Sequence, residues 1–171
     1  SLDLANQGVI DGEGLRVAGL EQQYPNLVQV PERFTSISFV AYARNTSIKL
    51  DQSWSSLKPH RIAFINGWKL FEANATEARS VTKVDKVEQL FQMLDADRVD
   101  VVLYTRTDGL AVLKRLGISN VEALTPSLRD ADMFLYLNKK HAAHVPRIAQ
   151  ALKDMKADGS YASIMAKISG Q

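Results

Sequence analysis

Short apolar runs alternate with segments of helical spacing through the middle of the chain. Residues 61–65 (RIAFI) and 99–104 (VDVVLY) are almost continuously apolar, which is typical of strands that are covered on both faces. Between them, Asp85 is predicted to cap a helix over 87–94, a segment with apolar side chains at positions i, i+3, i+4 and i+7, the spacing of an amphipathic helix. Strands joined through helices need crossover connections, so the pattern predicts an α/β fold with mainly parallel sheets flanked by helices.

The remaining elements suggest two lobes. Further strands are predicted at 36–44, 81–84 and 132–138, and further helices at 69–78, 108–116, 148–155 and 161–168. The polar stretch 45–59 separates the strand at 36–44 from a self-contained run of strands and helices. We therefore expect one discontinuous lobe built from residues 1–45 and 132–171, a second lobe built from residues 46–131, and two strands that cross between them.

Composition excludes several classes of protein. The 21 Lys and Arg residues and 19 Asp and Glu residues give a net charge of only +2, and the basic residues are scattered, which argues against nucleic-acid binding. The absence of cysteine excludes disulfides and thiolate metal sites. Because no nucleophile elbow, zinc signature, P-loop or dinucleotide fingerprint occurs, we predict a protein that is not an enzyme and uses no cofactor or metal.

Five phrases, in order along the chain, resemble one family. They are GVIDGEGLRVAG, LKPHRIAFINGWK, DADRVDVVLYTRTDG, DMFLYLNKKH and LKDMKADGSYASIMAKI. Together they resemble the bacterial periplasmic solute-binding proteins of the amino-acid-binding type, known as extracellular solute-binding protein family 3. The resemblance implies a two-lobed, type II periplasmic-binding-protein-like fold whose lobes close around a ligand through two crossing hinge strands.

The same resemblance implies a function and a set of partners. We expect the chain to bind a small polar solute, amino-acid-like or a small carboxylate, in an interlobe cleft as the substrate-binding component of an ABC-type transporter in the periplasm. Its macromolecular partner would be a membrane permease or a receptor. Two alternatives are a ligand-sensing periplasmic domain of a signalling protein and a dehydratase-like enzyme on the same scaffold.

Two departures from the family pattern qualify this expectation. Family members begin with a further strand and helix of the first lobe, and this chain starts without them and without a signal peptide. We therefore expect exposed apolar surface near Val9, Ile10 and Val17, and with it a homodimer or strand exchange. In addition, Tyr104 stands where amino-acid binders tend to carry an aspartate for the ligand's ammonium group.

The first candidate ligand-binding residues are Asn66, Gly67 and Trp68. They join the carboxyl end of a strand to the start of a helix, where free backbone N–H groups favour an anion. Gly67 would let the backbone approach the solute, and Trp68 would stack on a flat solute. The alternative is that Gly67 is only a turn residue and Trp68 a partly buried prop.

Three more candidates lie elsewhere in the sequence. Tyr104 and Thr105 end the next strand and could hydrogen-bond a ligand, whereas Asp108 fits the N-cap of the following helix better. Arg16 could bind a carboxylate through its planar, two-pronged guanidinium, or form a salt bridge with Glu13 or Asp11 instead.

Overall fold

The computed structural model describes residues 1–168 and divides into two compact units. Unit 1 comprises Ser1–Ile37 and the described residues from Ala131 onward, and unit 2 comprises Ser38–Asp130. The chain thus enters unit 2 between residues 37 and 38 and leaves it between residues 130 and 131. The predicted lobe boundary at 45/46 lies later in the chain than this first crossing, because the strand that begins in unit 1 continues into the core of unit 2.

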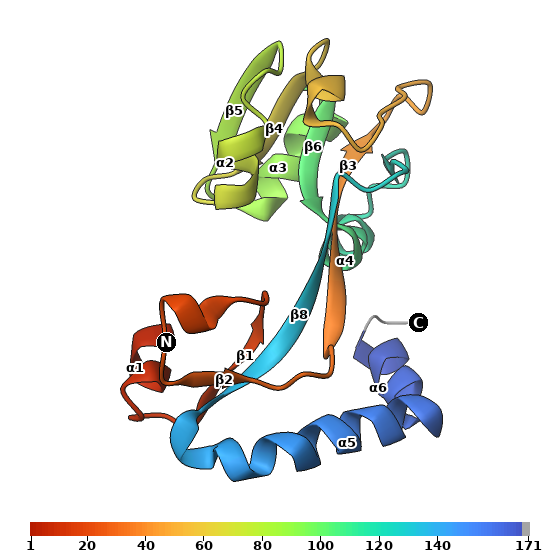
Figure 1. The fold of residues 1–171 in the computed structure, drawn as a ribbon. Helices are drawn as coiled ribbons and strands as arrows, with labels where there is room; N and C mark the ends of the chain where they lie inside the picture. The colour runs from red at the N-terminus through yellow and green to blue at the C-terminus, as the bar shows by residue number, and fades with distance from the viewer. Residues whose placement is uncertain (169–171) are drawn as a thin grey trace. The chain divides into compact units, whose positions relative to one another are not determined.

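Unit 2 is built on a sheet with a parallel centre. Strand β4 pairs in parallel with β5 and with β6, whereas β3 pairs antiparallel with β6 and with the short β7 (Figure 1). The strands are β3 (Thr35–Ala43), β4 (Arg61–Ile65), β5 (Ser80–Val84), β6 (Val101–Thr105) and β7 (Glu122–Ala123). The predicted parallel pairing therefore holds for the β5-β4-β6 core of this unit.

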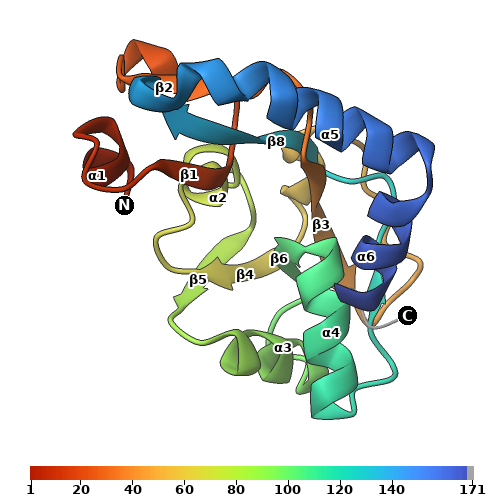
Figure 2. The same cartoon turned by 90° about the horizontal axis from the view of Figure 1, so that it is seen from below.

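Helices cover both faces of the unit 2 sheet. Helices α3 and α4 lie on one face and α2 on the other (Figure 2). Their bounds are α2 (Lys69–Asn74), α3 (Val87–Asp95) and α4 (Arg106–Leu116), with the 3-10 helix η2 at Trp54–Leu57. Along β4, Ala63 packs toward α3 and α4, while Ile62 and Phe64 pack toward α2. Burial on both faces explains why these strands are apolar at successive positions.

Three predicted helix boundaries in unit 2 are wrong. Helix α2 ends at Asn74 rather than near residue 78. Lys86, not Asp85, is the N-cap of α3, and α4 begins at Arg106 instead of Asp108, with Thr105 as its N-cap. The other end of α4 agrees with prediction, since Gly117 ends the helix in the left-handed conformation (φ 67°).

Unit 1 is built around one long antiparallel strand. Strand β8 (Arg129–Asn138) pairs antiparallel with β1 (Gly12–Arg16) and β2 (Leu27–Gln29), so the expectation of mainly parallel pairing is wrong in this unit. Its side chains alternate between two clusters, with Leu135 and Leu137 packed toward helix α5 and Tyr136 packed beside Leu27. The other elements are α1 (Leu2–Asn6), η1 (Leu20–Gln22), η3 (Lys139–His144), α5 (Val145–Ala157) and α6 (Ser160–Ile168).

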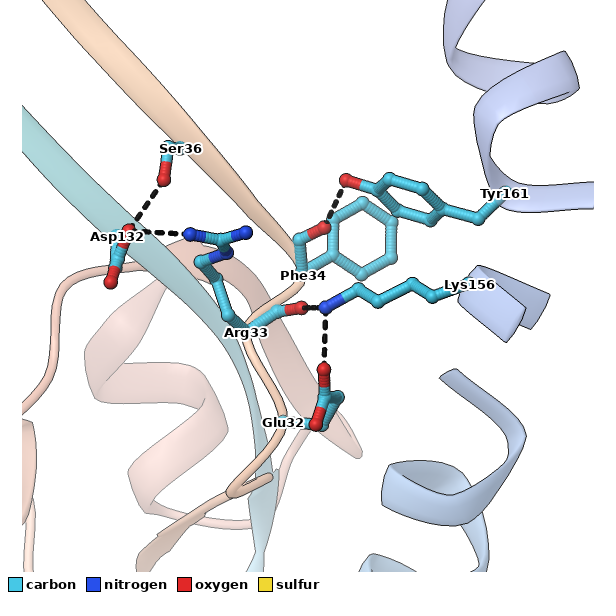
Figure 3. Close-up of polar contacts among 7 residues, drawn as sticks. All are labelled: Glu32, Arg33, Phe34, Ser36, Asp132, Lys156 and Tyr161. Carbon is cyan, nitrogen blue, oxygen red and sulfur yellow. Dashed lines mark hydrogen bonds and ion pairs between the residues drawn. The ribbon is translucent and has the colours of Figure 1, made fainter. Parts of the chain in front are cut away.

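Polar contacts tie the last two helices to the segment that precedes β3. The Lys156 ammonium of α5 pairs with Glu32 (2.6 Å) and donates to the carbonyl oxygen of Arg33, and the Tyr161 hydroxyl of α6 donates to the carbonyl oxygen of Phe34 (Figure 3). The Phe34 and Tyr161 rings meet edge to face, 6.5 Å between centroids. These contacts fix both C-terminal helices on unit 1.

Two further contacts in the same region join β3 to β8. Ser36 donates a hydrogen bond to the Asp132 carboxylate, which also accepts from Arg33 at 3.5 Å (Figure 3). Ser36 lies just before the chain enters unit 2, and Asp132 lies just after it returns. The two connecting segments are therefore hydrogen-bonded to each other where they belong to unit 1.

Candidate functional site

Five of the six candidate residues lie at one edge of the unit 2 sheet. Asn66, Gly67 and Trp68 follow the carboxyl end of β4, and Tyr104 and Thr105 end β6. Because β4 and β6 are parallel, their carboxyl ends meet at the same edge. The centroids of the Trp68 and Tyr104 rings are 4.8 Å apart, so the structure brings the two candidate loops together.

The aromatic rings at this edge stack on one another. Trp68 is stacked against Tyr104, with an interplanar angle of 26°, and against Phe71, with an angle of 10° and 5.5 Å between centroids. The Phe39 ring meets Trp68 edge-on at 6.3 Å. Trp68 thus uses its stacking surface within unit 2, which favours the interpretation of a partly buried prop over a platform for a flat solute.

The turn at Gly67 is closed by a side chain of the protein itself. The Gly67 N–H donates to Oε1 of Glu72 at 3.1 Å, and the ammonium groups of Lys69 and Lys83 each lie 3.2 Å from the same carboxylate. The Lys69 ammonium, then the Gly67 N–H and Lys83, hold the pKa of Glu72 below its usual range. The anion predicted to bind here is therefore already supplied by Glu72, a residue that the sequence reasoning missed.

Gly67 is needed for the backbone conformation of the turn and not for the close approach of another group. Its φ of 84° is in the left-handed region, and a Cβ built there would meet nothing within 4 Å in the described structure. The neighbouring Asn66 is exposed; its N–H donates to the carbonyl oxygen of Val84 (2.8 Å), and its carboxamide donates to Asp85 (3.5 Å). The carbonyl oxygen of the Asn66 side chain faces no donor among the described residues.

Tyr104 and Thr105 differ in what they can offer to a solute. Thr105 is only 8% exposed, and its hydroxyl donates to the Asp108 carboxylate at 3.2 Å, so this group is used within the unit. Tyr104 is half-buried, and its hydroxyl has no hydrogen-bond partner within residues 1–168. Burial, followed by the charges of Asp108 and Glu88, raises the Tyr104 pKa, so the hydroxyl stays protonated and can donate.

Asp108 does not cap its helix in the predicted way. It lies in the first turn of α4, accepts the Thr105 hydroxyl hydrogen bond and is otherwise exposed. No cation in the described part of the chain forms an ion pair with it. A free carboxylate therefore stands close to Tyr104 at the same sheet edge.

Two residues that support this edge were missed or misread in the sequence. Tyr42 lies in the predicted strand at 36–44 and is fully buried, and its hydroxyl lies 2.8 Å from the carbonyl oxygen of Thr105 and 2.7 Å from that of Arg106. Gly109 leaves room for it, because a Cβ at this position would lie 2.2 Å from the Tyr42 hydroxyl. A glycine inside a segment of helical spacing was the available signal.

Arg16 lies in unit 1 and pairs there with Glu13. Its guanidinium is 3.0 Å from Oε1 of Glu13 and 3.5 Å from the Ser1 hydroxyl, while its Nε is buried without a partner among the described residues. Of the two alternatives for Arg16, the structure contains the salt bridge.

Neither a metal-binding cluster nor a helix able to cross a membrane occurs within residues 1–168. His141 lies 2.7 Å from the Asp11 carboxylate and its ring is 6.2 Å from that of His144, and nowhere in this range do three or more His, Cys, Asp or Glu side chains gather as a metal site would require. In the same range, no helix combines the length and apolar character needed to cross a membrane.

Comparison with known proteins gives one distant sequence relative. No known protein family profile matches the chain. An uncharacterized protein of Shewanella oneidensis is 23% identical over 171 residues, covering 92% of this chain and 62% of the relative. The chain thus spans less than two thirds of that relative's length.

Similar solved structures define the fold. The GluR0 ligand-binding core in complex with L-glutamate has a TM-score of 0.74 at 12% identity, covering 97% of this chain and 75% of that one. A histidine kinase sensor domain similar to periplasmic binding proteins has a TM-score of 0.68 at 15% identity (97% and 72%). A Streptococcus pneumoniae amino acid ABC transporter substrate-binding protein bound to L-arginine has a TM-score of 0.68 at 10% identity (99% and 72%). The predicted periplasmic-binding-protein-like α/β fold is confirmed.

Proposed function

We propose that this chain binds a small polar solute and that the carboxyl edge of the unit 2 sheet is a contact surface for it. Open α/β sheets bind ligands at this edge, outside the carboxyl ends of their strands. The observation that carries the proposal is the stacked Trp68–Tyr104 pair, which brings the loop with the exposed Asn66 and the strand end with the unpaired Tyr104 hydroxyl to the same sheet edge. The arrangement is preformed, so little conformational entropy is lost on binding.

The chemistry at this edge suits binding better than catalysis. Thr105 is only 8% exposed and its hydroxyl is engaged with Asp108, while the Tyr104 hydroxyl, whose pKa is raised, has no hydrogen-bond partner among the described residues that could act as its base. We therefore favour a non-catalytic, periplasmic role as the substrate-binding component of an ABC-type transporter with a membrane permease as partner. A sensing role is the second candidate, because similar structures include both a transporter component and a histidine kinase sensor domain.

Fluorescence of Trp68 provides the test. In a Trp54→Phe background Trp68 is the only tryptophan, and its stacking on Tyr104 makes its emission sensitive to a solute at this edge. We expect a saturable change in emission with at least one member of a panel of amino acids, small carboxylic acids, sugars and polyamines. Calorimetry on the unmodified chain would confirm the affinity.

Two variants localise the binding. Tyr104→Phe keeps the ring stack and removes the free hydroxyl, so it should weaken binding about tenfold, the effect of losing one or two net hydrogen bonds. Val81→Ala is the matched control, because Val81 is exposed and lies near the start of β5, away from the carboxyl edge. A panel that produces no response by either method would refute the proposed function.

A further inference from the structure

Backbone N–H groups at the Asn66–Trp68 turn already have acceptors within unit 2. Asn66 donates to the carbonyl oxygen of Val84 at 2.8 Å, Gly67 to Glu72 at 3.1 Å and Trp68 to the carbonyl oxygen of Ile65 at 3.3 Å. A turn of this kind, between a strand and a helix, would otherwise offer these groups to an anionic solute. In this protein, acceptors within unit 2 already occupy these N–H groups.

The Glu72 carboxylate that accepts from Gly67 is held by charge as well as by hydrogen bonding. The Glu72 side chain is only 21% exposed, and its two oxygens lie 3.2 Å from the ammonium groups of Lys69 and Lys83. These lysines neutralise the carboxylate and hold it against the Gly67 N–H.

We propose that Glu72 acts as a built-in substitute for a solute carboxylate and makes this edge select amines that carry no carboxylate. This inference rests on the proposed function, since it names the class of solute for the same site. To reach the Gly67 N–H, a solute carboxylate would have to displace Glu72 from it and from the two lysines.

The groups that remain open at the edge are suited to an amine. The Asp108 carboxylate is exposed and has no ion pair with any described residue, and the Tyr104 hydroxyl and Asn66 carboxamide oxygen can accept hydrogen bonds from an ammonium or guanidinium group. The hydrocarbon part of such a solute could lie against the Tyr104 and Trp68 ring edges.

Matched pairs of solutes that differ only in the carboxylate test the proposal. Calorimetry on the full chain would compare arginine with agmatine and lysine with cadaverine. We expect each amine to bind at least tenfold more tightly than its parent amino acid. Equal or tighter binding of the amino acids would overturn the inference.

Variants of Glu72 supply the second arm. Glu72→Ala frees the Gly67 N–H and both lysines, so it should raise the affinity for arginine and lysine about tenfold and leave agmatine and cadaverine nearly unchanged. Glu72→Gln is the matched control, because its amide oxygen can still accept from Gly67, and it should change the amino-acid affinity less. An equal change for both members of each pair would also overturn the inference.

The two proposals fail in different ways. Unmodified chain that binds neither agmatine nor cadaverine contradicts the selection of amines, while the proposed function still stands if another member of the wider panel changes Trp68 emission. A Glu72→Ala protein without a cooperative thermal transition is not folded. In that case the question is decided by comparing the affinities of the unmodified chain and of Glu72→Gln for each pair of solutes.

Discussion

Units 1 and 2 bury their apolar residues in different ways. In unit 2, strands β4 and β6 are apolar at successive positions because helices cover both faces of the sheet. In unit 1, β8 packs Leu135 and Leu137 into one cluster and Tyr136 into another, but its antiparallel partners β1 and β2 are short. Large apolar side chains also stay exposed near the start of unit 1, with Val9 67% exposed, Ile10 37% and Val17 48%, as predicted from the sequence.

The contrast suggests where the stability of the chain is concentrated. Truncation of a side chain buried in the helix-covered core of unit 2 costs more than truncation of a similar side chain that stays in water near the start of unit 1. Three measurements test this difference between the units.

The largest effect is expected from Leu94→Ala. Leu94 is 1% exposed in the α3 face of the unit 2 core, so its truncation should lower the free energy of unfolding by about 2–5 kcal/mol. Leu4→Ala in unit 1 is the matched variant, since Leu4 is 45% exposed, and should cost less than about 0.5 kcal/mol. Denaturant unfolding and hydrogen exchange of peptides from both units would measure both variants, and similar losses would remove the distinction.

A smaller effect is expected from adding one methyl group. In Gly109→Ala the new Cβ would lie 2.2 Å from the Tyr42 hydroxyl, so the first turn of α4 must shift, at a cost of about 1–3 kcal/mol. Gly14→Ala in unit 1 meets only Leu135, at 3.8 Å, and should be close to neutral. Thermal unfolding measures the stability of both variants. The Gly109 variant should in addition bind solute more weakly, because α4 begins directly after the end of β6 and a shift of its first turn would displace Tyr104. A Gly109→Ala protein as stable as the unmodified chain would show that Tyr42 or the first turn of α4 can move at little cost in free energy.

The smallest effect is expected from acid. The Arg61 guanidinium lies 2.7 Å from Asp100 and, together with the Arg61 N–H, lowers the Asp100 pKa. A carboxyl group with a lowered folded pKa stabilises the protein above its unfolded pKa, near 3.9, and this contribution is lost as the pH falls through the lower folded value. Asp100→Asn should therefore reduce the difference in stability between pH 6 and pH 3, by no more than about 1 kcal/mol.

Asp132 in unit 1 provides the comparison for the acid effect. Its pKa is lowered mainly by the Ser36 hydroxyl, but its side chain is 55% exposed against 27% for Asp100. Asp132→Asn should change the pH dependence of the melting temperature less than Asp100→Asn does. The reverse order would show that solvent screening does not separate the two carboxylates.

The sequence predicted the strands of unit 2 better than the contacts at its edge. The run RIAFI coincides with β4, and the helical spacing at 87–94 falls within α3, because both patterns report burial. The starts of two helices were predicted wrongly. Asp85 and Asp108 were predicted as N-caps because aspartate is a common capping residue, whereas the N-caps in the structure are Lys86 and Thr105. Pairing direction in unit 1 was also wrong, because β8 has partners from the opposite end of the chain.

The sequence predicted where the candidate residues lie in the fold but not which contacts their side chains make. Parallel strands implied that Asn66, Trp68 and Tyr104 share one edge, which the 4.8 Å stack of the last two residues confirms. The stacking of Trp68 on Phe71 and the reach of Glu72 back to Gly67 depend on side-chain conformations, which a residue pattern does not encode.

The order of the two units along the sequence determines which of them can fold first during synthesis. Residues 38–130 are contiguous, so unit 2 can fold as soon as this stretch has left the ribosome. Strands β1 and β2 pair only with β8 among the described elements, and β8 is synthesised after all of unit 2. The strands in residues 1–37 therefore cannot complete their pairing until β8 has been synthesised.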